Sequence, residues 1–518
     1  MYKRQRLNEG WHLILRNQFH DVLAGSSVGE VYEEAERDYQ RVRELGEGAL
    51  QEALARIAAR IALKQKSLVV FNSLSWERND IVCAPLPNDL SDDFILVDGV
   101  TGKEVPWQQV SNDEGKPALI FRTTGIPSCG YKVYYLRPGV QRTTPSSVSA
   151  TEERLENEFF LVRLDSEGHI VSIYDKLHRR EIIPKGGRAN LFQAFEDRPL
   201  GGDAWDINVF YQNKMWELRD LERLRVIEKG PVRAGVELQR TWHRSKIRQR
   251  IYLYAGVPRI DFETEVDWHE HHILLKVAFP LEIHSTRATY EIQFGNVERP
   301  THWNTSWDLA RFEVPAQRWA DLSEGDYGVS LLNDCKYGYD IKDNVMRLTL
   351  IKSATYPDPK ADQGLHRFTY SLYPHVGNWR NGTVRRAAEL NDPLLALWEP
   401  SHPGDLPIQF SLVAVDRGNV LVDTVKLAED GDDLIVRVYE AHNQRGSVTL
   451  RFGSKIEAGW ECNLLEEPEE QLTPKGDTLT FFIKPYQVRT FRVRLSRLPR
   501  SGPIGLHGGP VRKETRGI

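Results

Sequence analysis

The sequence predicts a mainly β protein, with a short N-terminal helical segment followed by several antiparallel β-sandwich domains, so that the class is α+β overall. Two observations support this prediction. Apolar residues recur every three or four positions between Val28 and Ile61 with charged residues between them, which is typical of an amphipathic helix. After Lys66 come short β-branched and aromatic runs separated by Gly, Pro, Asn and Asp, which indicate many short strands.

The N-terminal segment, residues 1–66, is predicted to be a partial helical middle domain. It consists of an aromatic-rich helical stretch and the long amphipathic helix. Ser27 followed by Glu30 fits a capping box, which predicts that the long helix begins just after Gly25. The stretch 20–26 is then an interhelical loop.

The rest of the chain is expected to be nearly all β. The expected strands include 159–164, 233–242, 248–254, 259–268, 290–294, 345–351, 434–439, 447–452 and 478–483. The polar stretch 141–153 and the segment 381–405 are expected to separate domains, because Pro, Ser, Thr and Asn gather there. The expected units are a small β domain at 67–140, a large β-sandwich domain at 154–395, a C-terminal β-sandwich domain at 405–495 and a mobile tail at 496–518.

Composition excludes several classes of function. The chain has 518 residues, of which 40% are hydrophobic and 27% charged, as in folded multidomain proteins. The formal net charge of −5 gives no strong field for nucleic acid or an anionic membrane, so neither is expected as a partner. There is no HExxH, GxSxG, P-loop or strand–helix GxGxxG motif, so the zinc-protease, serine-hydrolase and nucleotide-binding classes have no support.

The location expected from the sequence is the cytoplasm. The four cysteines include no CxxC pair, which favours reduced thiols. The first apolar run is interrupted by Arg16, Asn17 and Gln18 and lacks a cleavage site, which argues against a signal peptide. No run approaches the about 18 apolar residues of a membrane span.

The first polar cluster is Asn17-Gln18-Phe19-His20-Asp21, at the end of the first helical stretch. There an imidazole can face a cavity and a carboxylate can orient a neighbour. Taken alone, a histidine among Trp11, Leu15 and Phe19 is more often a packed core residue than a metal ligand.

A second cluster comprises Glu196-Asp197-Arg198-Pro199 and Asp203-Ala204-Trp205-Asp206. Carboxylates that accept hydroxyl hydrogen bonds beside an indole that stacks on a pyranose are typical of a sugar site. A structural loop whose carboxylates bind turn amides is an equally good interpretation.

The third cluster is His269-Glu270-His271-His272, which we expect to lie in a strand. His269 and His271 would then share a face, but no third ligand follows nearby. A structural role is the favoured interpretation.

These clusters, together with further segments, resemble glycoside hydrolase family 38. Asn17 to Asp21 followed by Gly25-Ser26-Ser27 resembles the family signature NQFHDxLxGSS. The other matching segments, in order, are Asn157-Glu158-Phe159, Tyr174-Asp175-Lys176, Asp203-Ala204-Trp205-Asp206, Glu298-Arg299-Pro300-Thr301, Lys336-Tyr337-Gly338-Tyr339, Asp362-Gln363-Gly364-Leu365-His366 and Tyr370-Ser371-Leu372-Tyr373-Pro374-His375. The resemblance extends from about residue 8 to about residue 494 and corresponds to the C-terminal two-thirds of an α-mannosidase.

The resemblance implies a retaining α-mannosidase that removes terminal α-D-mannosyl residues from oligosaccharides with one zinc ion. It implies that His20 is a zinc ligand, that Asp21 contacts the sugar, and that Arg299 reaches the substrate from the large β domain. The nucleophile, the acid/base and the other zinc ligands belong in the family to an N-terminal catalytic domain that we expect to be missing here. No catalytic residue is therefore expected in this chain, which needs that domain as a partner besides its α-mannoside substrate; a homo-oligomer is a further expectation. The alternative is a non-catalytic carbohydrate-binding or scaffold β-sandwich protein.

Overall fold

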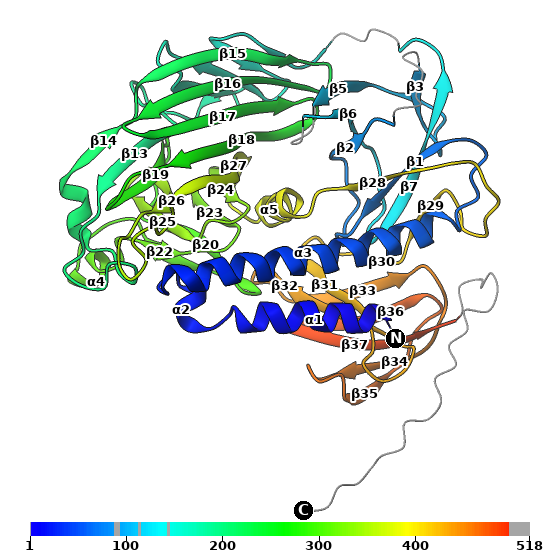
Figure 1. The fold of residues 1–518 in the computed structure, drawn as a ribbon. Coiled ribbons are helices and arrows are strands. Elements are labelled where there is room, and N and C mark those ends of the chain that lie inside the picture. Colours follow the sequence, from blue (N-terminus) through cyan, green and yellow to red (C-terminus); the bar gives the residue numbers. More distant parts are fainter. Residues whose placement is uncertain (1, 88–93, 112–114, 142–145, 497–518) are drawn as a thin grey trace, which may run out of the picture.

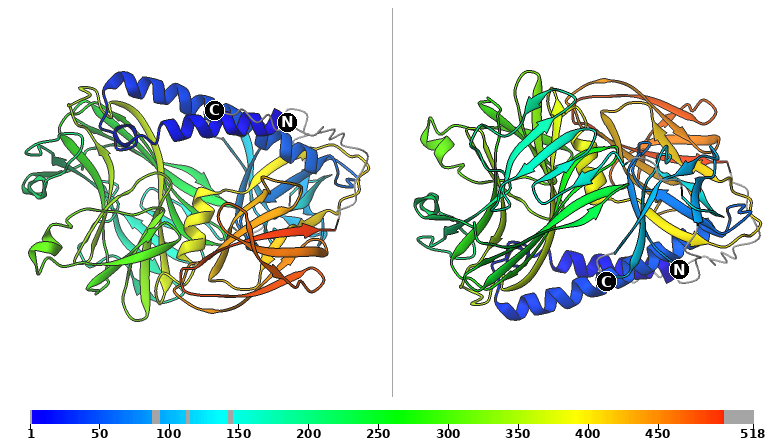
Figure 2. Two further views of the ribbon diagram at one scale, coloured as in Figure 1. Left: turned by 90° about the horizontal axis from the view of Figure 1, so that it is seen from below. Right: turned by 90° about the horizontal axis from the view of Figure 1, so that it is seen from above.

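The computed structural model describes residues 2–87, 94–111, 115–141 and 146–496. About 49% of the residues are in strands and about 13% in helices, which confirms the predicted mainly β class with helices at its beginning. A helical hairpin runs along one side of the molecule, from a large β unit to two smaller ones (Figures 1 and 2). Among the described helices, none is both long enough and apolar enough to cross a membrane.

Exposed charged pairs link the two long helices of the hairpin and show their relative direction. Its helices are α1 (Tyr2–Arg16), α2 (His20–Leu23) and α3 (Gly29–Ala58). Arg6 pairs with Glu52 and Arg41 with Glu9, so α1 and α3 are antiparallel. The C-terminal end of α3 packs its apolar face on the neighbouring sheet, where Leu54 and Ala58 join a core with Val69 and Val133.

The start of α3 differs from the prediction. Val28 is its N-cap residue and no side chain caps the helix, so the predicted capping box of Ser27 and Glu30 is wrong. Ser27 lies outside the helix, and its backbone N–H donates to the Tyr32 hydroxyl at 2.7 Å. The predicted loop 20–26 is also wrong in its first half, because α2 occupies it.

The first β unit contains two sheets. One sheet has the order β28-β1-β7-β3-β4, with β29 also paired to β7, and the other has the order β2-β6-β5. The bounds are β1 Ser67–Asn72, β2 Ile81–Pro85, β3 Phe94–Asp98, β4 Glu104–Val105, β5 Trp107–Ser111, β6 Pro117–Arg122, β7 Gly130–Pro138, β28 Leu395–Glu399 and β29 Gln409–Ser411. The sheet that begins at Ser67 is thus completed by strands from after residue 394, which pair with β1 and β7.

The large β unit is built on a nine-stranded antiparallel sheet, β15-β16-β17-β18-β27-β24-β23-β20-β21. Its strands are β15 Leu221–Lys229, β16 Arg233–Trp242, β17 Ser245–Tyr254, β18 Val257–Trp268, β20 Arg287–Ile292, β21 Gly295–Pro300, β23 Trp319–Ser323, β24 Tyr327–Asn333 and β27 Gly364–Val376. In β18, Ile260, Phe262, Val266 and Trp268 are separated by even steps, so they point to one face and enter the common core.

Two further sheets contribute to the same core. The first is β12-β11-β10-β9-β8 and the second is β14-β13-β19-β26-β25-β22. Their strands are β8 Ser149–Ala150, β9 Arg154–Glu156, β10 Phe160–Leu164, β11 Ile170–Asp175, β12 Arg180–Glu181, β13 Leu191–Glu196, β14 Met215–Glu217, β19 Ile273–Pro280, β22 Val314–Pro315, β25 Gly338–Lys342 and β26 Val345–Lys352. A short 3-10 helix, η1 (Val209–Asn213), and the one-turn helix α4 (Ser306–Leu309) lie in its loops.

The C-terminal unit packs two sheets around a separate core. Their orders are β30-β33-β36 and β31-β32-β37-β34-β35, and α5 (Thr383–Asn391) precedes this region. The bounds are β30 Val413–Val415, β31 Val420–Leu427, β32 Leu434–Glu440, β33 Gly446–Phe452, β34 Ile456–Cys462, β35 Pro468–Leu472, β36 Thr478–Ile483 and β37 Val488–Leu495. Residues 142–145 of the expected linker and 497–518 of the expected tail lie outside the described residues.

Candidate functional site

The structure places His20 at the surface, as the first residue of α2. Its side chain is 78% exposed, and its ring lies 4.3 Å from the ring of Phe19, centroid to centroid. Its Nε2 atom lies 3.5 Å from Oδ2 of Asp21. The imidazole is therefore accessible to solvent beside the Asp21 carboxylate, and it can bind a group from outside the hairpin.

Asp21 is held more firmly than its neighbour. Its Oδ1 atom accepts hydrogen bonds from the Ser26 hydroxyl at 3.1 Å and from Trp205 Nε1 at 3.3 Å. The Tyr32 hydroxyl donates to the Asp21 backbone carbonyl. The Gly25-Ser26-Ser27 turn thus folds back on the carboxylate, and a loop of the large β unit reaches it from the other side.

Asn17, the first residue of the signature, has a structural role. It is 5% exposed, and its side-chain amide donates to Asp38 of α3 and to the Leu13 carbonyl, each at 2.9 Å. Burial raises the pKa of Asp38, but hydrogen bonds from Asn17 and Arg16 outweigh it and leave that pKa below its usual value. Asn17 therefore fixes the end of α1 against α3, which positions His20 and Asp21.

In the loop from Asp203 to Asp206, the two carboxylates make hydrogen bonds within the protein and the Trp205 ring is exposed. Asp203 accepts hydrogen bonds from the backbone N–H and the hydroxyl of Thr355, and Asp206 accepts the backbone N–H of Ile207. These two carboxylates match the structural interpretation. Trp205 is 52% exposed and donates to Asp21, so it is available for the sugar-site interpretation.

Asp197, in the same predicted cluster, is also structural. It is buried and receives a hydrogen bond from Lys352. Burial raises the pKa of this carboxyl, and the Lys352 ammonium offsets only part of that effect.

An aromatic cleft of about 920 Å³ opens between the α2–α3 turn and the large β unit. Its walls include Trp205, Phe210 and Tyr337, all more than half exposed, and Ala24 borders it from the hairpin. Exposed aromatic rings around a polar opening are suited to the apolar faces of sugars. Phe210 and Tyr337 were not among the expected site residues, because only the folded chain brings these distant positions together.

Arg299 lies in a different small pocket. Its guanidinium group packs over the ring of Tyr290 at 4.7 Å, and burial lowers its pKa below the usual value. Phe312 and Val314 border both this pocket and the aromatic cleft. Within the described contacts, Arg299 is not joined to His20 or Asp21, so its role in substrate binding stays a prediction.

The histidine-rich cluster is a turn, which corrects the expectation of a strand. β18 ends at Trp268, so alternation along a strand does not set the directions of these side chains. His269 pairs with Asp267 at 2.8 Å, and Nε2 of His272 lies 3.2 Å from the Thr355 hydroxyl. These local contacts match the favoured structural interpretation.

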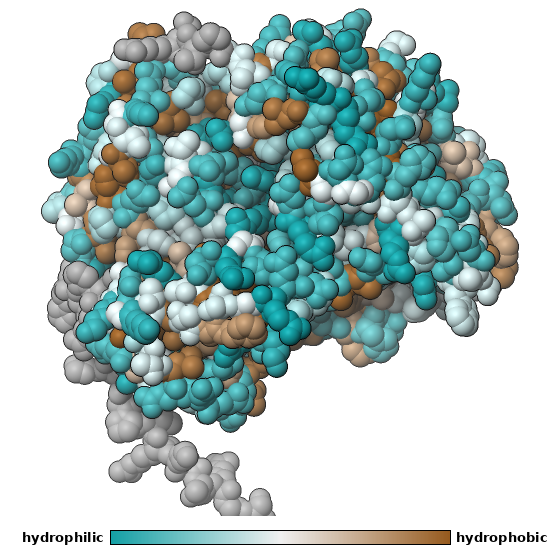
Figure 3. All heavy atoms as spheres, turned by 180° about the vertical axis from the view of Figure 1, so that it is seen from behind, coloured by the Kyte–Doolittle hydropathy of each residue, from teal (hydrophilic) through white to brown (hydrophobic). Residues whose placement is uncertain are grey.

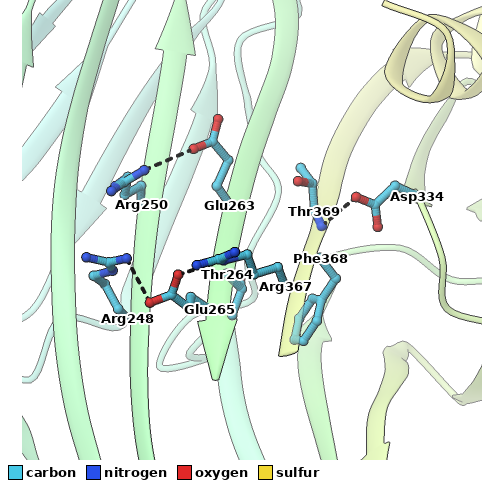
Figure 4. Close-up of a pocket in the computed structure, with 9 residues that line it drawn as sticks. All are labelled: Arg248, Arg250, Glu263, Thr264, Glu265, Asp334, Arg367, Phe368 and Thr369. Carbon is cyan, nitrogen blue, oxygen red and sulfur yellow. Dashed lines mark hydrogen bonds and ion pairs between the residues drawn. The ribbon is translucent and has the colours of Figure 1, made fainter. Parts of the chain in front are cut away.

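A second, charged pocket lies on the nine-stranded sheet (Figure 4). Its charges pair with one another: Arg248 and Arg367 both bind Glu265, and Arg250 lies 3.7 Å from Glu263. The charged side chains that could bind a ligand are already paired with one another. We therefore interpret this pocket as a feature of the sheet surface and not as a binding site.

The residues around His20 do not complete a zinc site. The ring of His20 and the carboxylate of Asp21 offer at most two neighbouring ligands, whereas a catalytic zinc takes about three protein ligands. Neither residue belongs to a cluster of three or more metal-ligating side chains within the described part of the chain.

Three family profiles match the chain in order. They are "Alpha mannosidase middle domain" over residues 1–57, "Glycosyl hydrolases family 38 C-terminal domain" over residues 155–360 and "Glycosyl hydrolases family 38 C-terminal beta sandwich domain" over residues 419–491. The chain therefore belongs to glycosyl hydrolase family 38 and corresponds to its middle and C-terminal domains, as predicted.

Individual relatives agree with this assignment. Alpha-mannosidase 2C1 of Homo sapiens is 35% identical over 513 residues, which cover 96% of this chain and 46% of the relative. Alpha-mannosidase G of Dictyostelium discoideum is 32% identical over 530 residues, which cover 95% and 48%, respectively. The chain thus spans about half the length of the curated relatives it matches.

A solved structure shows the same fold. The crystal structure of an alpha-mannosidase from Enterococcus faecalis V583 superposes with a TM-score of 0.79 at 18% identity, covering 95% of this chain and 64% of that one.

Proposed function

We propose that the chain acts as the middle and C-terminal part of a retaining α-mannosidase that hydrolyses terminal α-D-mannosyl residues of oligosaccharides. The observation that best supports this is the contact between Asp21 and Trp205 beside the exposed His20. A carboxylate that accepts hydroxyl hydrogen bonds next to an indole that can stack on a pyranose is suited to a sugar.

Within this proposal, His20 supplies one ligand of a zinc ion that is completed by residues outside this sequence. When bound, such an ion orients and polarises sugar hydroxyls. Ser26 and Trp205 occupy Oδ1 of Asp21, while Oδ2 lies on the side of His20 and is available to a substrate hydroxyl. Arg299 is a weaker candidate for substrate contact. The nucleophile and the acid/base are assigned to a catalytic domain outside this sequence. Retention uses one pair of carboxyl groups, one as nucleophile and one as acid/base.

The surface that would receive the catalytic domain is an apolar stripe on the hairpin. Leu7, Trp11 and Leu15 recur every four residues and so lie on one face of α1, and Phe19 and Leu23 continue the stripe at α2. These side chains are 46% to 64% exposed. The opposite side of the molecule is mainly hydrophilic with scattered apolar residues (Figure 3). A contiguous apolar stripe beside the candidate site is typical of a protein interface.

A cytoplasmic location is also proposed, because all four cysteines are free thiols. We also propose that the chain forms a homo-oligomer. Its partners would then be other copies of the chain as well as the α-mannoside.

The second candidate function is non-catalytic carbohydrate binding. The aromatic cleft supports it, since Trp205, Phe210 and Tyr337 all belong to this chain and need no partner to form a stacking surface. In that case His20 would be a surface residue without a metal.

Hydrolysis and calorimetry separate the two candidates. The chain alone is expected to leave an aryl α-mannoside uncleaved. Hydrolysis at the rate of a complete family 38 enzyme would refute the proposal that the nucleophile and the acid/base lie outside this sequence. Calorimetry with mannose and mannobiose, each with and without zinc, provides the second test. Zinc-independent binding by the chain alone favours the carbohydrate-binding function.

A further inference from the structure

A compact group of metal-ligating side chains lies in the turn between β10 and β11, outside the candidate site described above. The turn reads Asp165-Ser166-Glu167-Gly168-His169. One ligand atom from each of Asp165, Glu167 and His169 lies within 4.8 Å of the others. Nδ1 of His169 is 3.6 Å from Oδ1 of Asp165 and 3.5 Å from Oε2 of Glu167.

The histidine of this group is buried, and its Nδ1 atom has no hydrogen-bond partner. His169 is 1% exposed, and the backbone of Leu218 lies within hydrogen-bonding reach of its ring. Oε2 of Glu167 is likewise buried without a hydrogen bond. A buried polar atom without a partner costs about 1–3 kcal/mol, so Nδ1 of His169 and Oε2 of Glu167, which lie 3.5 Å apart without a hydrogen bond, point to a ligand between them. Oδ1 of Asp165 also accepts the backbone N–H groups of Glu167 and His169.

The distances suit a metal ion. Two ligands bound at about 2.1 Å in tetrahedral geometry are about 3.4 Å apart, close to both separations from Nδ1 of His169. The Glu167 side chain is 40% exposed and the Asp165 side chain 22%, so an ion can enter from solvent.

The surrounding charges limit how strongly a cation can bind. Arg188 lies 3.3 Å from Oδ2 of Asp165, and the guanidinium of Arg240 donates to the Glu167 carbonyl at 2.5 Å. These two cations oppose an incoming ion. The affinity is therefore expected to be lower than that of a structural site built from thiolates.

We propose that Asp165, Glu167 and His169 form a binding site for one divalent transition-metal ion, separate from the candidate sugar site. One imidazole with two carboxylates suits zinc or cobalt better than calcium or magnesium, which prefer oxygen ligands alone. Arg240 belongs to β16 and donates to the Glu167 carbonyl, so an ion here would stabilise the β10–β11 turn where it packs against the nine-stranded sheet. The ion would have a structural role.

The test uses the full chain without a histidine tag, titrated with zinc by calorimetry and with cobalt by visible absorption. The wild type is expected to bind one ion at this site. Glu167→Gln should weaken binding about tenfold or more, because it removes the charged ligand and preserves the shape of the side chain. Glu167 is part-exposed, so this variant should fold, and far-ultraviolet circular dichroism checks that it does.

His20→Gln is the matched control, since His20 is the other proposed metal ligand. It should leave the zinc affinity of this site unchanged. The proposal is overturned if the wild type binds no zinc or if Glu167→Gln binds it as tightly as the wild type. Loss of binding in His20→Gln alone would also overturn it, while supporting the proposed zinc ligand in the sugar site. Thermal denaturation gives a second measurement, because zinc should raise the Tm of the wild type and not that of Glu167→Gln.

Discussion

Trp205 Nε1 donates a hydrogen bond to Oδ1 of Asp21 at 3.3 Å, although the two residues are 184 positions apart in the sequence. The contact joins the end of the helical hairpin to a loop of the large β unit. Because Asp203 anchors that loop to Thr355, the indole has a defined position relative to the carboxylate. The candidate sugar site therefore depends on two parts of the fold that are far apart in the sequence.

Trp205→Phe tests this contact. The substitution keeps an aromatic ring in the cleft and removes the donor to Asp21, so kcat/KM for an α-mannoside should fall about twofold to tenfold in the complete enzyme, the equivalent of one hydrogen bond. Trp307→Phe, in the exposed one-turn helix α4, is the control and should leave the rate unchanged. Equal rates for both variants would remove Trp205 from the site.

Asn17→Ala should destabilise the hairpin by about 1–3 kcal/mol, because it removes a buried amide that donates to the part-exposed Asp38 and to the Leu13 carbonyl. Urea unfolding measures the change, and limited proteolysis should show earlier cleavage between α1 and α3. Gln18→Ala, at the exposed neighbouring position, should have no effect. A stable Asn17→Ala variant with normal proteolysis would contradict the structural role.

Lys276→Met should cost about 3–5 kcal/mol of unfolding free energy. The Lys276 ammonium is fully buried and binds Glu313 at 2.6 Å and Asp340 at 2.7 Å. Its removal takes the ammonium from Glu313 and leaves Asp340 paired with Arg347 alone. Lys342→Met breaks a part-exposed pair with Asp343 and a cation–π contact with Trp303, and should cost about 1 kcal/mol or less. Similar urea midpoints for the two variants would show that the buried network contributes little.

The same network predicts a pH dependence. Burial raises the pKa of Asp340, but Lys276 and Arg347 outweigh it and leave the pKa below its usual value. A carboxyl whose pKa is depressed by folding adds stability above its unfolded pKa of about 3.9, and this contribution is lost as the pH falls through the folded pKa.

Asp340→Asn should therefore be less stable than the wild type at pH 6, and the difference should narrow toward pH 3. Unfolding free energies from urea titrations at the two pH values give the comparison. A constant difference across that range would contradict the assigned direction of the shift.

Leu15→Glu tests the apolar stripe. Leu15 is 62% exposed, so the folded chain should lose less than about 0.5 kcal/mol of stability, while binding of a hydrophobic dye should decrease. Association with a family 38 catalytic domain, measured by analytical ultracentrifugation, should weaken. Unchanged association would locate the interface elsewhere.

Much of the fold could be predicted because its cause is local. The three- and four-residue spacing of apolar positions predicted α3, and the β-branched and aromatic run at 259–268 predicted most of β18. Local patterns failed where a neighbouring element decided the outcome. The backbone N–H of Ser27 donates to the Tyr32 hydroxyl, and α3 begins after Ser27. The capping-box sequence therefore does not cap the helix.

The proposed metal-binding turn was not identified from the sequence, although its residues are close together there. Asp165, Glu167 and His169 lie within five consecutive positions, and a carboxylate–carboxylate–imidazole pattern at a Gly-containing turn was visible in the sequence. What the sequence did not reveal is burial. His169 becomes a candidate ligand only because folding buries its ring and leaves Nδ1 without a hydrogen-bond partner.

The sequence by itself determined the mainly β class, the family and the identity of His20 and Asp21 as candidate site residues, because periodicity and short ordered motifs are properties of neighbouring positions. The tertiary structure decided which side chains meet. In the fold, β28 pairs with β1 and Trp205 contacts Asp21. The aromatic cleft forms from distant residues, and Arg299 packs on Tyr290. These outcomes depend on burying apolar area between elements far apart in the chain, and no local pattern specifies which distant surfaces will be buried together.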